Sequence, residues 1–364
     1  MTLSNRATII PQSPIRKLVK YSQEAKQRDV KVYHLNIGQP DLPPPPAAMD
    51  FLHNYQEPVI EYSHSQGEKA FLKGLVGYYH RLGHTDLSAD NFIATVGGSE
   101  AILWAIITVA NPGEEVLVFE PFYTNYRSLA LMAGVNIVAV TTKVEDGFHL
   151  PAKEEIAKKI SAKTKAIILC NPNNPTGTLY ADQELDDLYD LCQEHDLFFL
   201  SDEVYREFVY GGRQAVSLLT IEKERSKNLA ESRVIILDSF SKRYSLCGAR
   251  IGLACSRNKT IIETMLKYGQ ARLSAVSIMM QMAAEIIKDD RDYLKKMVAE
   301  FARRRQALIN GLNKISGVLF REPEGAFYIT VKLPIKDAEE FSQWLLTDFH
   351  DHQETVMLAP AAGF

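Results

Sequence analysis

The chain has 364 residues, 46% of them hydrophobic and 24% charged, which is ordinary for a folded protein and allows one large domain with a smaller one. Its formal net charge is −4 with both signs interspersed, so the basic surface needed to bind nucleic acid or an anionic membrane is not expected. Since no apolar run has the length of a membrane span and the N-terminus lacks a signal-peptide core, we expect a cytoplasmic protein that acts on small molecules.

The predicted elements alternate along the chain. Short apolar runs that lack polar alternation, each followed by turn-forming residues, are typical of buried strands, and they are Glu115–Phe119, Asn136–Val140, Lys165–Cys170, Leu197–Leu200 and Val234–Leu237. Amphipathic helical patterns lie between them, for example over Ser99–Ala110 and Ala181–His195. The alternation predicts an α/β fold with a mostly parallel central sheet covered by helices.

The last third of the chain has a different pattern. Beyond Arg257 the helical stretches are long and rich in Met, Lys and Arg, and we expect Arg291–Leu312 to form one long surface helix. The run Gly325–Val331 then begins a short tail of strands and helices. We therefore expect a large domain over residues 47–285 and a smaller α+β domain formed by residues 1–46 and 286–364 together.

The cysteines give no sign of a metal site or a disulfide framework. Cys170, Cys192, Cys247 and Cys255 form no C-x-x-C pair, and no cluster of histidines accompanies them. We expect them to be reduced thiols and expect no metal.

Three polar clusters follow predicted strands, namely Asn171–Gly177, Ser201–Tyr205 and Ser239–Lys242. If these strands share one parallel sheet, the clusters meet at its carboxyl edge, where ligands bind in open α/β folds. A lysine amine there can form an imine with an aldehyde, and a buried carboxylate can keep a pyridine nitrogen protonated. The set therefore suits a cofactor with a ring nitrogen, a phenolic oxygen and an aldehyde.

Each cluster also has a plain structural explanation when taken alone. A lysine in a serine-rich loop is usually solvated, Asp202 could cap a helix, and Asn171–Gly177 could be only a turn. The functional interpretation rests on the clusters occurring together with one consistent chemistry.

A family resemblance strengthens that interpretation. Ser239–Gly252 (SFSKRYSLCGARIG) resembles the lysine signature of the class I and II pyridoxal-phosphate aminotransferases, which have fold type I, and further motifs of that family follow in order from Asn36 onward. The resemblance implies that Lys242 forms a Schiff base with pyridoxal 5′-phosphate, and that Asp202 pairs with the pyridine nitrogen.

The same resemblance assigns further contacts with the ring. It implies that Tyr205 donates to the ring oxygen and that Asn174 contacts both this oxygen and the substrate carboxylate. Tyr123, in the stretch EPFY, would stack on the ring, and the backbone of Gly38, in NIGQPD, would contact the substrate carboxylate.

The cofactor phosphate would need an anion site. Gly97–Ala101 follows the apolar run Phe92–Val96 and opens a helix, so its backbone N–H groups and the helix dipole can face an anion. By the resemblance, the phosphate contacts come from three backbone groups and two side chains, those of Gly98, Ser99 and Glu100 and those of Ser239 and Arg250.

The resemblance also implies a homodimer with shared active sites, because Tyr62 would reach the phosphate of the partner subunit. Arg272 has two readings: it could contact an acidic substrate side chain across the dimer, or it could form a structural salt bridge. The resemblance gives no preference between them.

Members of the family extend about twenty residues beyond a segment like Met357–Phe364, to an arginine that binds the substrate carboxylate. We therefore expect the C-terminal end of the small domain to be truncated here, with Asn174 and Gly38 as a weaker anchor. Losing such a charged partner commonly costs about 2–5 kcal/mol of binding. On this expectation the chain binds the cofactor but transaminates slowly.

The leading functional hypothesis is an aminotransferase that moves an amino group between an α-amino acid, with aspartate as the first candidate, and a 2-oxo acid such as 2-oxoglutarate. One alternative is a pyridoxal-phosphate lyase on the same fold. Another is a cofactor-sensing regulator, which we disfavour because only residues 1–35 precede the first motif.

Overall fold

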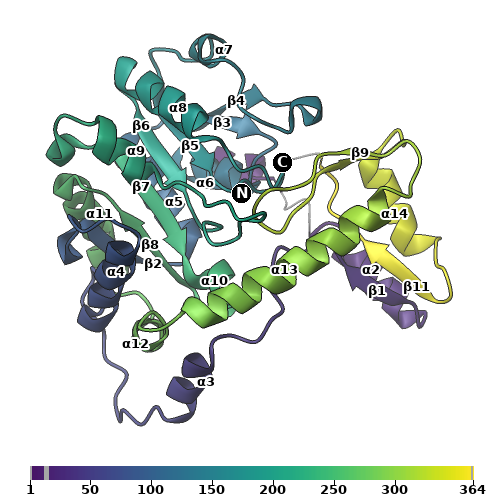
Figure 1. The fold of residues 1–364 in the computed structure, drawn as a ribbon, viewed down its shortest axis with the longest axis horizontal. Helices are drawn as coiled ribbons and strands as arrows, with labels where there is room; N and C mark the ends of the chain where they lie inside the picture. The colour runs from purple at the N-terminus through teal and green to yellow at the C-terminus, as the bar shows by residue number, and fades with distance from the viewer. Residues whose placement is uncertain (1, 12–15, 362–363) are drawn as a thin grey trace.

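The computed structural model describes residues 2–11, 16–361 and 364. Its largest sheet contains β2 (Phe92–Val96), β3 (Glu115–Glu120), β4 (Asn136–Thr141), β5 (Thr164–Cys170), β6 (Phe198–Asp202), β7 (Val234–Ser239) and β8 (Ile251–Cys255). The strand order across the sheet is β2-β8-β7-β6-β5-β3-β4 (Figure 1). The five strands predicted from apolar runs coincide with β3 to β7 within two residues at each end.

The sheet is parallel except at β8, which runs antiparallel to both its neighbours, β2 and β7. The expectation of a mostly parallel sheet is confirmed. β8 was not predicted, because its short apolar run follows the lysine signature directly and no helical pattern separates it from β7. Its reversed direction has a consequence for the site: β8 begins at the edge of the sheet where the parallel strands end.

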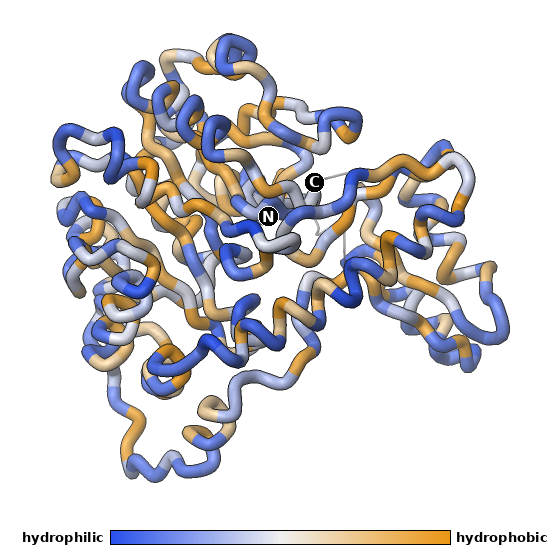
Figure 2. Tube along the Cα trace, in the orientation of Figure 1, coloured by the Kyte–Doolittle hydropathy of each residue, from blue (hydrophilic) through white to orange (hydrophobic). Residues whose placement is uncertain are grey.

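Helices cover both faces of the sheet, because successive strand residues point to opposite sides. In β3, Leu117 and Phe119 pack into one hydrophobic cluster with α4, α8, α9 and α12, whereas Val116 and Val118 pack into another with α5, α6 and α11. Figure 2 shows the apolar strands between more polar helices. The helices of this region are α3 (Pro46–His53), α4 (Lys69–Arg81), α5 (Gly98–Val109), α6 (Asn125–Ala133), α7 (Lys153–Ala157), α8 (Asp182–Glu194), α9 (Leu218–Arg225), α10 (Phe240–Arg243), α11 (Lys259–Arg272) and α12 (Ser277–Ile286).

A second, smaller region combines segments from near both ends of the chain. Strand β1 (Lys31–His34) pairs in parallel with β11 (Glu354–Met357), and β9 (Leu319–Phe320) pairs with β10 (Val331–Lys332). A small core of Leu18, Ala25, Val30, Val32, Leu346 and Met357 lies beneath β1 and β11. The helices of this region are α2 (Val19–Gln27), α13 (Arg291–Leu312) and α14 (Ala338–Thr347). The short helix α1 (Asn5–Ile9) instead contacts the large region, where Arg6 Nη1 donates to the Met132 carbonyl oxygen of α6 at 3.2 Å.

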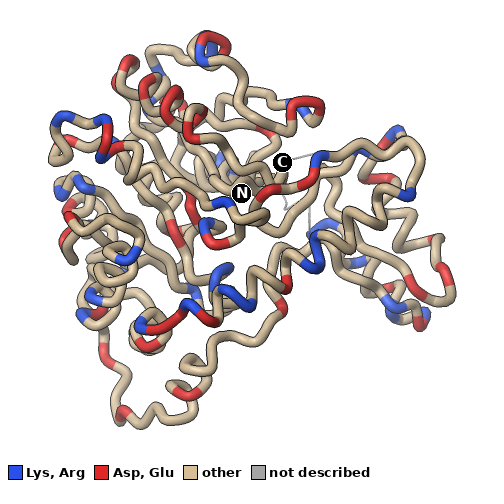
Figure 3. Tube along the Cα trace, in the orientation of Figure 1, with Lys and Arg blue, Asp and Glu red and all other residues tan. Residues whose placement is uncertain are grey.

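The long helix α13 has the bounds predicted from the sequence and runs between the two regions (Figure 1). Short 3₁₀ turns complete the described elements: η1 (Ala89–Asn91), η2 (Val144–Asp146), η3 (Leu229–Glu231) and η4 (Cys247–Ala249). Lys and Arg are interspersed with Asp and Glu over both regions (Figure 3). Among the described helices, none combines the length and the apolar character that crossing a bilayer would take.

Candidate active site

The predicted polar clusters meet at one edge of the central sheet. Asn171 follows β5, Asp202 ends β6 and Ser239 ends β7, and these three strands are parallel neighbours. Strand β2 ends at the same edge, just before α5, and β8 begins there, just after Arg250. The sheet topology therefore brings together residues that are far apart in the chain, such as Gly98 and Arg250.

Lys242 lies in the short helix α10, which the Ser239 side chain caps by accepting a hydrogen bond from the Ser241 N–H. Its Nζ donates to the carbonyl oxygen of Gly38 at 2.6 Å, so the N-terminal segment lies next to the lysine. The Cys247 Sγ lies 4.0 Å away. Burial lowers the pKa of the Lys242 amine below its ordinary 10.5, and the nearby Arg250 charge acts in the same direction.

Asp202 is buried at the end of β6 and has no cationic side chain as a hydrogen-bond partner among the described residues. Its Oδ2 accepts a hydrogen bond from the Tyr126 hydroxyl at 2.6 Å, and its Oδ1 faces the Val204 N–H at 3.4 Å. Burial raises the pKa of Asp202 to about 6, although both hydrogen bonds oppose the rise. Such a carboxyl group would bind a cation from a ligand favourably.

Tyr205 connects Asn174 to the last third of the chain. Its hydroxyl accepts from Asn174 Nδ2 at 3.2 Å and lies 2.6 Å from the hydroxyl of Tyr328. Burial raises the pKa of Tyr205 well above 10, so this phenol is a hydrogen-bond donor at neutral pH. The three polar side chains thus form one connected row along the edge.

The start of α5 has the geometry of an anion site. No side chain caps its first turn, and the N-cap residue is Gly97 at φ +75°. A Cβ on Gly97 would lie 2.2 Å from Arg250 Nη2, so only glycine lets this guanidinium approach the helix start. Arg250 itself has a left-handed φ of +55°, and its Nη1 donates to the Cys247 carbonyl oxygen at 2.8 Å. An arginine and uncapped N–H groups therefore face the same space.

Tyr123 lies beside this anion site. Asn125 Nδ2 donates to its hydroxyl at 2.8 Å, and its pKa is raised by burial and by the charge of Asp202, with opposing contributions from Ser99 and Arg250. Its ring packs edge-on against that of Tyr126, which donates to Asp202.

Glu100 and Arg272 form a structural pair. Arg272 Nη1 lies 2.5 Å from Glu100 Oε2, and the guanidinium sits over the Trp104 ring at 4.9 Å. The Glu100 carboxylate also accepts from the Val96 N–H at 2.7 Å. Of the two readings of Arg272, the structure shows the salt bridge.

Tyr62 stands apart from the other predicted residues. It is 78% exposed, on the segment between α3 and α4. Among the residues that the structure describes, it makes no hydrogen bond to the edge described above.

Two residues of the site had been given no role on the sequence, Tyr126 and Tyr328. Tyr126 lies in the first turn of α6, and its ring packs edge-on against that of Tyr123, with the centroids 5.6 Å apart. Its place three positions after Tyr123 is the only local signal that points to it. Tyr328 belongs to the segment EGAFY, but only the folded chain brings it to Tyr205.

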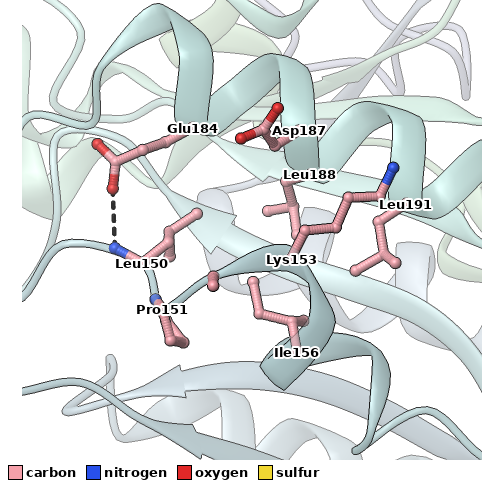
Figure 4. A pocket seen from close by; sticks show the side chains of 9 residues that line it. Leu150, Pro151, Lys153, Ile156, Glu184, Asp187, Leu188 and Leu191 are labelled. Atoms are coloured by element: carbon pink, nitrogen blue, oxygen red, sulfur yellow. Dashed lines mark hydrogen bonds between the residues drawn. The ribbon is translucent and has the colours of Figure 1, made fainter.

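A pocket of about 130 Å³ lies elsewhere, between the segment around Leu150–Ile156 and α8 (Figure 4). Its polar lining includes Glu184, which accepts a hydrogen bond from the Leu150 N–H at 2.8 Å. None of the predicted site residues lines this pocket.

The donor set at the sheet edge fits a flat ligand with three distinct ends. The α5 start and Arg250 suit a phosphate, the Asp202 carboxylate suits a protonated ring nitrogen, and the desolvated Lys242 amine suits a carbonyl carbon. These are the chemical groups of pyridoxal phosphate, so the residues present fit the cofactor that the resemblance implies.

Comparison with known proteins gives the family. The sequence model of the class I and II aminotransferases matches residues 30–352. The chain is 29% identical to an aspartate aminotransferase of Thermotoga maritima over 98% of this chain and 90% of that protein. It is 30% identical to an aromatic-amino-acid aminotransferase of Thermococcus litoralis, covering 100% and 91% of the two chains.

Solved structures agree with this assignment. The crystal structure of the Thermotoga maritima aspartate aminotransferase superposes with a TM-score of 0.89 at 28% identity, covering 99% of this chain and 92% of that one. The alanine aminotransferase of Pyrococcus furiosus gives 0.87 at 28% identity, covering 97% and 90%. The chain belongs to the class I and II aminotransferases, a family of enzymes that use pyridoxal phosphate.

Proposed function

We propose that this aminotransferase binds pyridoxal 5′-phosphate at the carboxyl edge of the central sheet, with Lys242 joined to the cofactor aldehyde. The observation that carries the proposal is the position of the Lys242 amine, which is desolvated and held at Gly38 beside Asp202 and Arg250. When bound, the cofactor supplies an aldehyde that takes up the amino group and a ring that withdraws electrons from the substrate α-carbon.

The roles of the surrounding residues follow from their chemistry. Asp202, with a pKa of about 6, is ionised at neutral pH and holds a proton on the ring nitrogen. Tyr205 and Asn174 donate hydrogen bonds to the ring oxygen, and Tyr123 covers the ring. The N–H groups of Gly98, Ser99 and Glu100 bind the phosphate at the start of α5. The side chains of Ser239 and Arg250 bind the same phosphate.

Lys242 Nζ would act as the general base that removes the proton from the substrate α-carbon and delivers it to the carbon that carried the aldehyde oxygen, as amino-group transfer requires. Because burial lowers its pKa, a larger fraction of the amine is neutral near pH 7 than for an exposed lysine. The Gly38 backbone and Asn174 hold the substrate carboxylate on the side of the site that the N-terminal segment covers.

The substrates we propose are aspartate as amino donor and 2-oxoglutarate as acceptor, since several relatives are named aspartate aminotransferases. Because other relatives are named for aromatic amino acids and alanine, a panel of donors should include all three kinds. The alternative of a lyase is not favoured by these relatives; a lyase would release ammonia, whereas an aminotransferase forms one keto acid for each amino group transferred.

An absorption spectrum with added cofactor tests the proposal. We expect a visible band that is lost in Lys242→Ala and kept in Lys267→Ala, which removes an exposed lysine of α11. An unchanged spectrum in Lys242→Ala would remove the basis of the proposal.

We also propose a homodimer in which Tyr62 contributes to the partner's phosphate site. The segment between α3 and α4 exposes apolar side chains, with Val59 63% and Ile60 68% exposed. We expect Val59→Asp with Ile60→Asp to give a monomer in sedimentation, while Ile315→Asp, at a comparably exposed position in the small region, leaves the dimer intact.

The division into a large domain of residues 47–285 and a small domain of residues 1–46 and 286–364 remains our proposal. The pairing of β1 with β11 and the small core beneath them support it. We likewise propose a cytoplasmic location, supported by four free cysteines, three of them buried.

A further inference from the structure

Two arginines directly follow residues of the proposed site: Arg206 comes after Tyr205, and Arg243 comes after Lys242. Both are buried, and Arg243, 1% exposed in its side chain, is among the largest fully buried side chains of the described chain. Removing a guanidinium from water costs several kcal/mol, so its partners must have good geometry. None of the roles proposed above uses either arginine.

Arg243 is held on the side of α10 opposite to the site. Its Nη2 donates to Asp238 Oδ1, and its Nε lies 3.4 Å from Glu207 Oε2. The guanidinium also sits over the ring of Tyr78, 4.8 Å from the centroid. Lys242, one residue earlier, points instead to Gly38.

Arg206 reaches the same aspartate from the turn that follows β6. Its Nε and Nη2 donate to Glu203 Oε2 at 2.9 and 2.6 Å, and its Nη1 lies 3.4 Å from Asp238 Oδ2. The hydroxyls of Tyr78 and Tyr79 on α4 accept from the same guanidinium at 3.1 and 3.3 Å. Asp238, with no exposed surface, therefore gives one oxygen to each arginine.

The five charged residues come from only two segments, each adjacent to the site. Glu203, Arg206 and Glu207 follow Asp202, whereas Asp238 and Arg243 flank the turn from Ser239 to Lys242. Strands β6 and β7, which lead into these segments, are parallel neighbours. The contacts of Asp238 with Arg206 and of Arg243 with Glu207 join one segment to the other.

We propose that Arg243 and Arg206, acting through Asp238, are positioning residues that fix the Lys242 helix against the segment that carries Asp202 and Tyr205. This inference rests on the proposed role of Lys242. Because Lys242 and Arg243 are consecutive in a four-residue helix, movement of the guanidinium moves the amine as well. Loss of Arg243 lets α10 shift, and the Lys242 amine gains water.

The test measures the Lys242 amine in the protein without cofactor. The rate of acetylation of Lys242 by a trace amount of acetic anhydride is followed against pH by mass spectrometry of its peptide. We expect Arg243→Met to raise the pKa of this amine by about one unit, because relief of burial favours the charged form. We expect cofactor affinity to fall about tenfold in parallel.

Arg243→Lys separates position from charge. A lysine keeps the charge but cannot bridge Asp238 and Glu207 with one compact ammonium, so we expect an intermediate change in both readouts. This variant also serves if Arg243→Met does not fold.

Arg257→Met and Arg257→Lys are the matched controls, because Arg257 forms a buried pair with Glu222 at the far edge of the sheet. They should lower the melting temperature without changing the pKa of Lys242 or cofactor affinity by more than twofold. The inference is wrong if the Arg243 variants change only the melting temperature. It is also wrong if the Arg257 variants change the pKa of Lys242 and the cofactor affinity as much as the Arg243 variants do. Failure of the wild-type protein to bind the cofactor through Lys242 would instead contradict the proposed function.

Discussion

Buried charge is arranged differently at the two edges of the central sheet. At the far edge, Arg257 pairs with Asp86 Oδ2 at 2.6 Å and with Glu222 Oε2 at 2.8 Å. At the candidate site, Lys242 donates to a backbone carbonyl and Asp202 accepts from a phenol. The charges at the far edge are thus satisfied within the chain, as are those of Arg206, Arg243 and Asp238 next to the site. Lys242 and Asp202 differ from both groups, because their partners are neutral.

The pKa values of Asp86, at the far edge, and Asp202, at the candidate site, show the effect of this difference. Burial favours the neutral form of both, but at Asp86 the hydrogen bond and charge of Arg257 outweigh burial and lower the pKa to about 2. At Asp202 burial prevails, and the pKa rises to about 6. A ligand that brings a cation to Asp202 would supply there what Arg257 supplies to Asp86. Charge left without an ionic partner therefore marks the functional edge.

The largest effect is expected for Lys242→Ala. We predict that transamination falls by about 10⁴-fold or more, because the variant lacks both the covalent anchor and the general base. Steady-state kinetics with aspartate and 2-oxoglutarate measures the change. A melting temperature within a few degrees of wild type would show that the fold is intact, and a loss below tenfold would contradict the role of Lys242.

A substitution at the far edge should lower the free energy of unfolding but leave the catalytic rate unchanged. Arg257→Met leaves Glu222 buried without its cation, so we predict a loss of about 3–5 kcal/mol in the free energy of unfolding, measured with urea. The kcat of the remaining folded protein should stay within twofold of wild type. A large drop in kcat with little loss of stability would contradict the division between the two edges.

The pH dependence of stability tests the pKa of Asp202. In the protein without cofactor, the folded-state pKa of about 6 lies above the ordinary 3.8, so folding favours the protonated form. The resulting stabilisation is present below pH 4 and is lost as the pH rises through 6. The difference corresponds to about 3 kcal/mol, since one pKa unit is worth about 1.4 kcal/mol.

Asp202→Asn isolates this contribution, because it removes the titration and leaves other groups in place. Other residues titrate in the same range, among them His84, whose pKa burial lowers to about 4 and whose contribution has the opposite sign. We therefore predict that wild type loses about 3 kcal/mol more than Asp202→Asn between pH 4 and pH 7. Parallel curves for the two proteins would show that Asp202 is not desolvated in this way.

The smallest effect is expected for Tyr126→Phe. Removing one hydrogen bond to a charged group costs about 1.5–3 kcal/mol, so we predict a tenfold or greater loss of cofactor affinity, measured by fluorescence titration. Tyr210→Phe is the control, because the buried Tyr210 hydroxyl donates to the Ala326 carbonyl oxygen at the same 2.6 Å. Equal losses of affinity in both variants would argue that Tyr126 acts only on stability.

Much of the fold could be predicted because its signals are local. Apolar runs such as Lys165–Cys170 mark strands, and the 3.6-residue periodicity marks α13 over Arg291–Leu312. Strand β8 was missed, because antiparallel insertion between β2 and β7 depends on long-range pairing that no local pattern records.

Some residues of the candidate site could likewise be predicted from local sequence, whereas others could be found only in the folded chain. The residues that follow strands, such as Asp202 and Lys242, could be expected at one edge, since parallel strands end together. The contact of Tyr126 with Asp202 joins residues 76 positions apart and depends on how α6 packs on the sheet. The choice between the two readings of Arg272 likewise required the position of Glu100.

The most direct test of the account is to locate the cofactor on the chain. The protein is incubated with pyridoxal phosphate, reduced with borohydride, digested and examined by mass spectrometry. We predict that the reduced adduct lies on the peptide containing Lys242 and is blocked by an excess of an amino donor. If the reduced adduct is found on other lysines, or on no peptide at all, the central claim that Lys242 is the cofactor anchor is contradicted.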